Sequence, residues 1–472
     1  MLNFQSLFFD NPVCILLPSL LGDGQRKQIK KPPLSISLLK RAIITGGIAG
    51  AAIIIGVAVS ITYGLEQTSS DTMPFLEKEV IRDWEGEEMW VHLLLSGSEE
   101  YVVYNEISKV VANLAVADFN AYQNERQAAW GIKLLVNEFD DDPKDALEEI
   151  YADGVRLLEE SDDPARYPYQ TFLLGPTTSS AIEQLLDYEA NDVLIISHGS
   201  TAPSLAIPDN IFRLTPDDTK QARATAKAMS DAGIDVVVPI YRDDVWGNEL
   251  RDEISSAFAV YGGVADVGIV YTPDETSFVD QVLMISEKVG AYIDQGYSTE
   301  NVAVLVLSFG EGVTILNHAA SYEDLASVTW FGSDSTAQSI LVTSDPTALE
   351  FAEKVGLISP LFLVAPNERT ERIDKTVVQE TGSLPSNNMY ALYDAVWIHG
   401  LTINEGKTLE IKALLDILPR VAEEYDGVIG STTLNAAGDL ASADYELFWI
   451  QDGVWKIYGI YTAFDDKITL TP

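Results

Sequence analysis

Four short segments rich in hydroxyl, carboxylate or aromatic side chains each follow a predicted strand. They are Gly175-Pro-Thr-Thr-Ser-Ser180, His198-Gly-Ser-Thr-Ala-Pro203, Tyr241-Arg-Asp-Asp-Val-Trp-Gly247 and Gly332-Ser-Asp-Ser335. Hydroxyls and free backbone amides at the start of a helix suit an anion such as a carboxylate. The last segment adds a single carboxylate at a strand end. The first segment is therefore a candidate for binding a carboxylate.

Each segment also has an ordinary structural interpretation. The hydroxyls before the helix predicted at 180–188 could simply cap that helix. Asp334 could cap a helix in the same way, and Trp246 could belong to the hydrophobic core. The sequence leaves these alternatives open.

Strand-like and helix-like runs alternate along most of the chain, and this alternation must position the four segments. The predicted strands are Met89–Leu95, Ile132–Val136, Thr171–Leu174, Val193–Ser197, Asp235–Ile240, Val267–Tyr271, Val302–Leu307 and Val328–Phe331. Nearly continuous apolar strands that alternate with helices predict parallel sheets covered on both faces. The expected fold class is α/β, with two doubly wound parallel-sheet lobes and a first crossing between them near Phe212–Pro216. In such sheets ligands bind at the carboxyl ends of the strands.

The end of the chain departs from this alternation. Tyr445–Trp449 and Val454–Tyr461 are aromatic-rich runs joined by Gln451-Asp452-Gly453. Because Asp-Gly between two strand-like runs is a strong hairpin signal, we predict an antiparallel hairpin here.

The charge of the chain is strongly negative and unevenly distributed. The 472 residues carry a formal net charge of −42 at pH 7, yet residues 1–65 contain six basic and only two acidic side chains. An acidic surface repels phosphates, so no nucleic-acid partner is expected. Cys14 is the single cysteine, which excludes internal disulfides and thiolate-rich metal sites.

An uncharged stretch, Ala42–Leu65, follows Arg41. At about 1.5 Å per residue it is long enough for a helix to cross a membrane. A cleaved signal peptide and a buried soluble helix are the alternatives, but the stretch is longer than a usual signal core and ends without a clear cleavage pattern. The basic residues before it place residues 1–41 in the cytoplasm and the acidic part outside the cell. The prediction is a single-pass cell-membrane protein whose C-terminal domain is extracellular.

The four segments occur in the same order as in a known family. From about Trp90 to Tyr461 the chain resembles the branched-chain amino acid (Leu/Ile/Val) ABC transporter substrate-binding proteins, which have the type I periplasmic-binding fold. The resemblance is carried by Leu93-Leu-Leu-Ser-Gly97, Gly175–Ser180, Ile195–Pro203, Phe212-Arg-Leu-Thr-Pro-Asp-Asp218 with Gln221, Tyr241–Gly247, Tyr390-Ala-Leu-Tyr-Asp-Ala395, Gly438-Asp-Leu and the final hairpin. It implies two lobes joined by a hinge.

The resemblance also implies a role for each site residue. Ser179, with Thr178 beside it, matches the hydroxyl that holds the ligand carboxylate. Gly199 and Thr201 match residues that meet the amino acid head group, and Asp334 matches the acidic partner of the ammonium. Two aromatic residues complete the implied ligand site: Trp246 closes over the ligand from the second lobe, and Tyr101 lies near the side-chain pocket.

The chain differs from the family at three points in these segments. His198 stands where proline is common, and Asp334 replaces a glutamate. Ser308-Phe-Gly310 lacks a clear counterpart of the family's second tyrosine. Because relatives of this fold also bind amides, ureas and other small amino compounds, the ligand identity stays open.

The charge and hydropathy pattern, together with the resemblance, implies a domain organisation. We expect a basic cytoplasmic tail (1–41), a transmembrane anchor (42–65) and a linker (66–87). Lobe 1 would then comprise 88–213 and 366–430, and lobe 2 would comprise 214–365 and 431–465.

The function implied is capture of an amino acid or related small polar amino compound by lobe closure, for delivery to ABC permease and ATPase subunits. The alternative is a ligand-sensing ectodomain that acts with a signalling partner. No catalytic motif, cofactor or metal is expected: the four histidines show no metal-ligand spacing, and Asp140-Asp-Asp142 is interpreted as a helix cap, with a weak cation site as the alternative.

Overall fold

The computed structural model describes residues 87–98, 101–140, 142–160, 171–186 and 193–471. The predicted tail (1–41), the predicted anchor (42–65) and all but the last residue of the predicted linker lie outside these residues. Within the described part of the chain, no helix is both long enough and apolar enough to cross a membrane. The anchor therefore stays a prediction.

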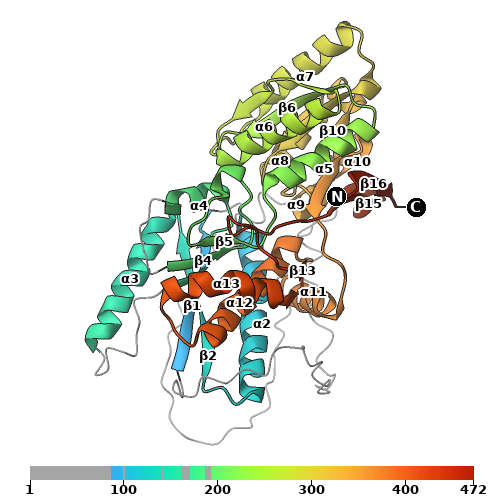
Figure 1. The fold of residues 1–472 in the computed structure, drawn as a ribbon. Coiled ribbons are helices and arrows are strands. Elements are labelled where there is room, and N and C mark those ends of the chain that lie inside the picture. Colours follow the sequence, from blue (N-terminus) through green and yellow to red (C-terminus); the bar gives the residue numbers. More distant parts are fainter. Residues whose placement is uncertain (1–86, 99–100, 141, 161–170, 187–192, 472) are drawn as a thin grey trace, which may run out of the picture. The chain divides into compact units, whose positions relative to one another are not determined.

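The first sheet has five parallel strands in the order β2-β1-β3-β4-β5 (Figure 1). They are β1 (Glu87–Ser96), β2 (Trp130–Phe139), β3 (Thr171–Leu174), β4 (Val193–Ser197) and β5 (Ile211–Arg213). Every residue of β3 and β4 is buried, as expected for strands covered on both faces. The predicted bounds of β3 and β4 are confirmed, whereas β5 was predicted only as the start of the crossing.

Helices from two distant parts of the chain accompany this sheet. They are α2 (Val102–Glu125), α3 (Pro143–Glu160), α4 (Ser179–Leu186), α11 (Glu368–Thr381), α12 (Asn387–Gly406) and α13 (Ile411–Glu424). The α12 helix packs along α2 and is buried at nearly every position from Asn387 to Ile403. A helix that is apolar on all sides has no hydrophobic stripe, which explains why the sequence pattern did not predict it.

The second sheet joins parallel strands to an antiparallel end. Its order is β16-β15-β14-β11-β10-β9-β6-β7, and β8 also pairs with β6. The strands are β6 (Val236–Arg242), β7 (Val264–Ala265), β8 (Ile269–Tyr271), β9 (Val302–Leu307), β10 (Thr329–Phe331), β11 (Ile358–Phe362), β14 (Tyr445–Gln451), β15 (Val454–Thr462) and β16 (Lys467–Leu470). Two short strands, β12 (Asp426–Gly427) and β13 (Gly430–Ser431), pair separately.

The helices that accompany the second sheet follow its parallel strands. They are α5 (Asp218–Asp231), α6 (Val245–Val260), α7 (Val279–Asp294), α8 (Gly312–Ala319), α9 (Ile340–Ser344) and α10 (Pro346–Lys354). The predicted α/β class with two parallel sheets is confirmed, and β9 has the predicted bounds.

The predicted hairpin is confirmed, since β14 and β15 pair antiparallel and are joined by two residues. Asp452 has φ 56° and Gly453 has φ 76°. Positive φ at both central residues is typical of a type I′ turn, whose twist matches that of the flanking strands. The third strand of this antiparallel end, β16, was not predicted.

Three segments connect the two sheets: residues 214–217, 363–367 and 432–444. At the first and third segments, Arg213 donates two side-chain hydrogen bonds to Asp439, at 2.5 and 2.8 Å. Both side chains are 1% exposed. The backbone N–H of Arg213 donates to Gly438, and its carbonyl accepts from Leu440. A buried ion pair thus joins the end of β5 to the third connecting segment, while the exact lobe boundaries stay a prediction.

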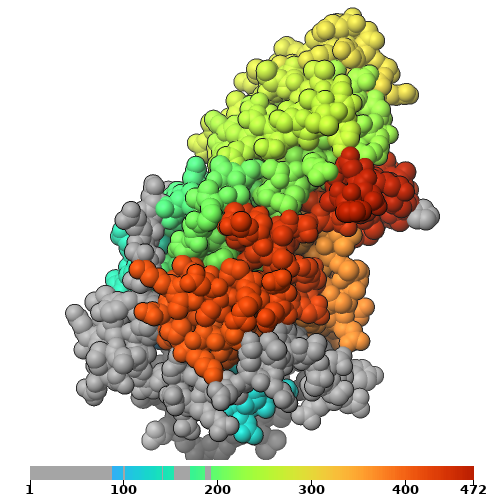
Figure 2. All heavy atoms as spheres, viewed as in Figure 1, coloured from blue at the N-terminus to red at the C-terminus, as the bar shows by residue number. Residues whose placement is uncertain are grey.

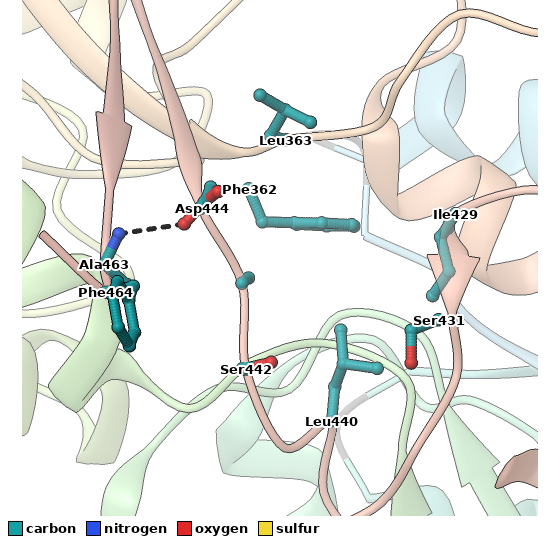
Figure 3. A pocket seen from close by; sticks show the side chains of 10 residues that line it. Phe362, Leu363, Ile429, Ser431, Leu440, Ser442, Asp444, Ala463 and Phe464 are labelled. Atoms are coloured by element: carbon teal, nitrogen blue, oxygen red, sulfur yellow. Dashed lines mark hydrogen bonds between the residues drawn. The ribbon is translucent and has the colours of Figure 1, made fainter. Parts of the chain in front are cut away.

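A pocket of about 530 Å³ lies beside these connections (Figure 3). Residues of the second and third connecting segments line it together with Phe464, which follows β15 and is 95% exposed. The Asp444 carboxylate accepts a hydrogen bond from the Ala463 N–H at 2.8 Å. The C-terminal strands, dark red in Figure 2, form part of the surface that this view shows. None of the predicted site residues lines this pocket.

Candidate functional site

The loops after β3 and β4 are held together by the Ser179 hydroxyl. Ser179 begins α4 and is 2% exposed. Its Oγ accepts hydrogen bonds from the backbone N–H groups of Thr201 and Ala202, both at 3.1 Å, and lies 3.1 Å from the Ser200 Oγ. The predicted residues Ser179 and Thr201 are thus in direct contact. Thr178 instead accepts from the N–H of Ala181 at 3.3 Å, inside α4.

Gly199 allows the same two loops to approach closely. A Cβ atom at this position would lie 2.4 Å from Thr177 Cγ2 and 3.0 Å from the Thr177 carbonyl oxygen. Any larger residue would therefore push the β4 loop away from the β3 loop. The sequence selected Gly199 for its small size, and the structure gives the contact that requires it.

An unbroken series of hydrogen bonds continues from this loop to the second sheet. Thr201 Oγ1 donates to the Asp218 carboxylate at 2.9 Å, and Gln221 Nε2 donates to the same carboxylate at 2.7 Å. The backbone N–H of Asp334 donates to Gln221 Oε1 at 2.9 Å. We call Ser179, Thr201, Asp218, Gln221 and Asp334 the polar chain.

Burial and mutual repulsion perturb the two acids of the polar chain. Asp218 is fully buried, and its burial, followed by the negative charge of Asp334, raises its pKa well above the usual range. Burial also raises the pKa of Asp334 to about 6. Two carboxylates that are difficult to ionise together favour a cation between or beside them. The nearby Arg213 lowers the pKa of Asp218 only in part and is itself paired with Asp439.

Three aromatic rings form a row between the sheets. Trp246 stacks on Phe309 with ring centroids 4.6 Å apart, and Phe309 meets the edge of Tyr101 at 6.3 Å. We call Tyr101, Phe309 and Trp246 the aromatic row. Trp246 is 3% exposed and belongs to the core of the second sheet, so Phe309 is the ring that reaches Tyr101. The Arg242 guanidinium lies 4.6 Å from the Phe309 ring centroid.

The aromatic row is fixed by charged groups at the end of β6. Arg242 donates to Asp244 at 2.8 Å and to Glu311 at 2.9 Å. The Asp244 carboxylate in turn accepts from the Gly247 N–H and caps α6, whose second residue is Trp246. This cap fixes the start of α6 and therefore the position of Trp246 in the first turn of that helix.

The structure thus places the predicted residues in two groups. Ser179, Thr201 and Asp334 belong to the polar chain, and Tyr101 and Trp246 belong to the aromatic row. Gly199 supports the polar chain, whereas Thr178 contacts α4 alone. Sequence reasoning missed three contributors: Phe309 had no family counterpart, and Asp218 and Gln221 were assigned only to the crossing. Their side-chain partners are far away in sequence, so no local pattern indicates them.

In the described part of the chain, no group of three or more His, Cys, Asp or Glu side chains could hold a metal ion. Asp142 accepts from the Lys144 N–H at 2.8 Å at the start of α3, as predicted for a helix cap. Asp141 lies outside the described residues.

Most of the chain, residues 108–453, matches the family described as "Receptor family ligand binding region". The chain belongs to this family. Members of the receptor family ligand binding region bind ligands, and solved solute-binding proteins share the fold of this chain. The predicted resemblance to branched-chain amino acid ABC substrate-binding proteins is therefore confirmed.

Two relatives match the sequence, one over most of this chain and the other over about a third of it. The uncharacterized protein MJ1266 of Methanocaldococcus jannaschii is 25% identical over 398 residues, which are 80% of this chain and 90% of that protein. Glutamate receptor 2.1 of Arabidopsis thaliana is 25% identical over 155 residues, which are 32% of this chain and 16% of the receptor.

The structure is similar to several solved solute-binding proteins. A substrate-binding protein of Desulfitobacterium hafniense, in complex with Leu, has a TM-score of 0.56 and 20% identity, covering 79% of this chain and 100% of that chain. The leucine-binding protein LivK of Thermotoga maritima has a TM-score of 0.62 and 13% identity, covering 80% and 99%. LivJ of Streptococcus pneumoniae, in complex with isoleucine, has a TM-score of 0.58 and 16% identity, covering 82% and 100%. At these identities the similarity establishes the fold alone.

Proposed function

We propose that this protein is a membrane-anchored, extracellular solute-binding protein that captures an amino acid or a related small amino compound. The observation that carries the proposal is the pair of buried acids in the polar chain. Asp218 and Asp334 share Gln221 as a neighbour, and each acid raises the cost of ionising the pair. A ligand ammonium would stabilise both carboxylates at once, because charge-assisted hydrogen bonds are strong in a dry site.

The ligand carboxylate would bind at the opposite end of the polar chain. The start of α4, with Ser179 as its first residue, provides backbone N–H groups and the positive end of the helix dipole. Ser179 Oγ already receives two N–H groups from the β4 loop. We therefore expect the carboxylate to displace one of these loop contacts when it binds.

Closure of the two lobes would enclose the bound ligand. Tyr101 approaches Phe309 between the sheets, and the Ser204 N–H donates to Glu249 of α6 at 2.9 Å. Each of these contacts joins a residue of the first lobe to a residue of the second. Opening the lobes would therefore break them.

Calorimetry with matched ligands tests amino acid binding. We expect the full-length protein to bind at least one L-amino acid and to bind the corresponding 2-hydroxy acid at least about tenfold more weakly, since a hydrogen bond to a charged group contributes about 1.5–3 kcal/mol. Equal affinity for the two compounds would show that no ammonium is recognised. Failure to bind any amino acid would refute the proposed ligand class.

We further propose that residues 42–65 anchor the protein and that the acidic part lies outside the cell. An uncharged stretch after basic residues supports this arrangement. Protease added to intact cells should digest the 88–465 region but leave residues 1–41 protected. Release of the protein by alkaline washing, or a mature mass that lacks residues 1–65, would contradict a retained anchor.

Delivery to ABC permease and ATPase subunits is the proposed biological role. The fold shared with LivK and LivJ over 80% and 82% of the chain supports transport more than sensing, since the match to glutamate receptor 2.1 covers only 32% of it. Permease and ATPase genes next to this gene would support the proposal. A neighbouring signalling kinase gene without a permease would favour a sensing ectodomain.

A further inference from the structure

Four polar side-chain atoms at the facing edges of the two sheets are buried and have no hydrogen-bond partner among the described residues. They are the Tyr104 hydroxyl and His198 Nδ1 on the first lobe, and the Ser308 and Ser333 hydroxyls on the second. His198, Ser308 and Ser333 are each 0% exposed. A buried polar group without a partner costs free energy, and a polar molecule bound at these strand-end loops would supply the missing partners.

Tyr104 and His198 lie side by side. Their rings are stacked with centroids 6.2 Å apart and planes 9° from parallel. His198 follows β4, and its Nε2 lies 3.4 Å from the Thr177 hydroxyl of the β3 loop. Thr177 is also the polar neighbour of the Tyr104 hydroxyl, and the negative charge of Asp334 acts on Tyr104 from the second lobe. This pair of rings therefore adjoins the polar chain.

Both rings are uncharged. Burial lowers the pKa of His198 to about 3, so the imidazole is neutral at physiological pH. Burial raises the pKa of Tyr104, so its hydroxyl keeps its proton. In either tautomer, Nδ1 of a neutral imidazole offers one hydrogen bond, as donor or acceptor, and the phenol offers a donor and an acceptor.

The two arginines at the same edges are already paired. Arg213 binds Asp439, and Arg242 binds Asp244 and Glu311. A ligand with an anionic side chain would find neither of these arginines free, whereas an aliphatic side chain would leave the Tyr104 and His198 atoms without partners. An amide or hydroxyl side chain would satisfy both atoms and introduce no charge.

We propose that Tyr104 and His198 determine specificity, and that they select an amino acid with an uncharged, hydrogen-bonding side chain over branched aliphatic and acidic ones. This inference rests on the proposed function, because it assigns the side-chain end of the same ligand.

Calorimetry of the full-length protein with glutamine, serine, leucine and glutamate tests the inference. We expect glutamine or serine to bind at least tenfold more tightly than leucine and glutamate. Tyr104→Phe and His198→Leu should each weaken binding of the preferred ligand by about three- to tenfold, as for loss of one hydrogen bond. The affinity for leucine should change by less than about twofold. His198→Asn, which keeps a donor and an acceptor, should retain most of the preference.

His399→Leu is the matched control. His399 of α12 is also buried and has an unpartnered Nδ1, and its Nε2 donates a hydrogen bond to the Leu173 carbonyl inside the first lobe. Its replacement should lower the thermal midpoint without changing ligand preference. Melting curves verify that each variant folds, and if His198→Leu does not, the near-isosteric Tyr104→Phe decides.

Two outcomes overturn the inference while the proposed function stands. One is tightest binding of leucine or glutamate by the unmodified protein, and the other is an unchanged preference in both Tyr104→Phe and His198→Leu. Failure of all four amino acids, and of the wider set of amino acids tested for the proposed function, would refute the proposed function itself and the inference with it.

Discussion

Asp218 and Asp334 are held by the same glutamine side chain. Gln221 donates from Nε2 to the Asp218 carboxylate at 2.7 Å and accepts at Oε1 from the Asp334 N–H at 2.9 Å. One amide thus fixes two acids whose negative charges repel each other. Both carboxylates are therefore harder to ionise than in water, and such raised pKa values are typical of functional sites.

Ligand affinity should depend on pH through this pair. The pKa of Asp334 is about 6 in the ligand-free protein, and an ammonium binds only the ionised carboxylate. Affinity should be higher at pH 7.5 than at pH 5 and fall by up to about tenfold per pH unit below 6, because protonation then competes with binding. Asp218, whose pKa is also raised, would make the fall steeper. Calorimetry at pH 7.5 and pH 5 measures the effect.

The control for this dependence is Asp334→Asn. An amide cannot titrate, so this variant should bind weakly at both pH values and show a flatter profile. The head groups of simple amino acids do not titrate between pH 5 and 7.5. Equal affinity of the unmodified protein at both pH values would therefore exclude Asp334 and Asp218 as the ammonium partners.

Gly199→Ala should disturb the contact between the β3 and β4 loops. The new Cβ would lie 2.4 Å from Thr177 Cγ2, and relief of such overlap typically costs about 1–3 kcal/mol. We expect a lower free energy of unfolding in urea and weaker ligand binding. Thr177→Ser, which removes Cγ2, should restore part of the loss in the double variant.

Gly290→Ala is the matched control for that substitution. Its Cβ would make only an ordinary contact, 3.5 Å from Asp324 Oδ2, inside α7. Alanine should then stabilise the helix by up to about 1 kcal/mol. If both glycine variants changed stability in the same direction, the close approach at Gly199 would not be the cause.

Arg213→Met should strongly destabilise the protein. It leaves Asp439 buried and without its guanidinium partner, and breaking a buried ion pair costs about 3–5 kcal/mol. The double variant Arg213→Met/Asp439→Leu should be more stable than the single variant, because no charge then remains buried. Urea unfolding of all forms measures the difference.

An exposed ion pair provides the comparison for Arg213. Lys133 lies 3.4 Å from Glu88, with side chains 45% and 62% exposed. Lys133→Ala should change the free energy of unfolding by at most about 1 kcal/mol. A similar loss at Lys133 and Arg213 would argue against a special role for burial at the connecting segments.

Phe309→Ala should weaken ligand binding by disrupting the aromatic row. It removes the ring that contacts both Tyr101 and Trp246, and aromatic pairs contribute about 0.5–1.5 kcal/mol each beyond burial. We expect about a two- to tenfold loss of affinity and a larger radius of gyration in small-angle scattering, since the closed lobes lose a contact.

Tyr458→Ala tests whether that effect is specific to the row. Tyr458 meets Trp449 edge-on at 5.2 Å within the β14–β15 hairpin. Its loss should leave both ligand affinity and radius of gyration unchanged. Reduced affinity in Tyr458→Ala would indicate a general loss of stability rather than a role in closure.

The fold class and several elements follow from local sequence patterns. Val302–Leu307 and Thr171–Leu174 are unbroken apolar runs bounded by polar loops, and such runs specify buried parallel strands locally. Asp452-Gly453 specified its hairpin because only a few residues adopt positive φ readily. The sequence also selected the loops after β3 and β4, since strand ends in this fold bear the ligand site.

The contacts between side chains from distant segments become visible only in the folded chain. The Ser179 hydroxyl is occupied by the N–H groups of the next loop, Gln221 joins Asp218 to Asp334, and Phe309 takes the place that faces Tyr101. Periodicity reports which face of an element is buried, but it does not identify the partner from another part of the chain. These partners come together only when the carboxyl ends of two separately folded sheets face each other.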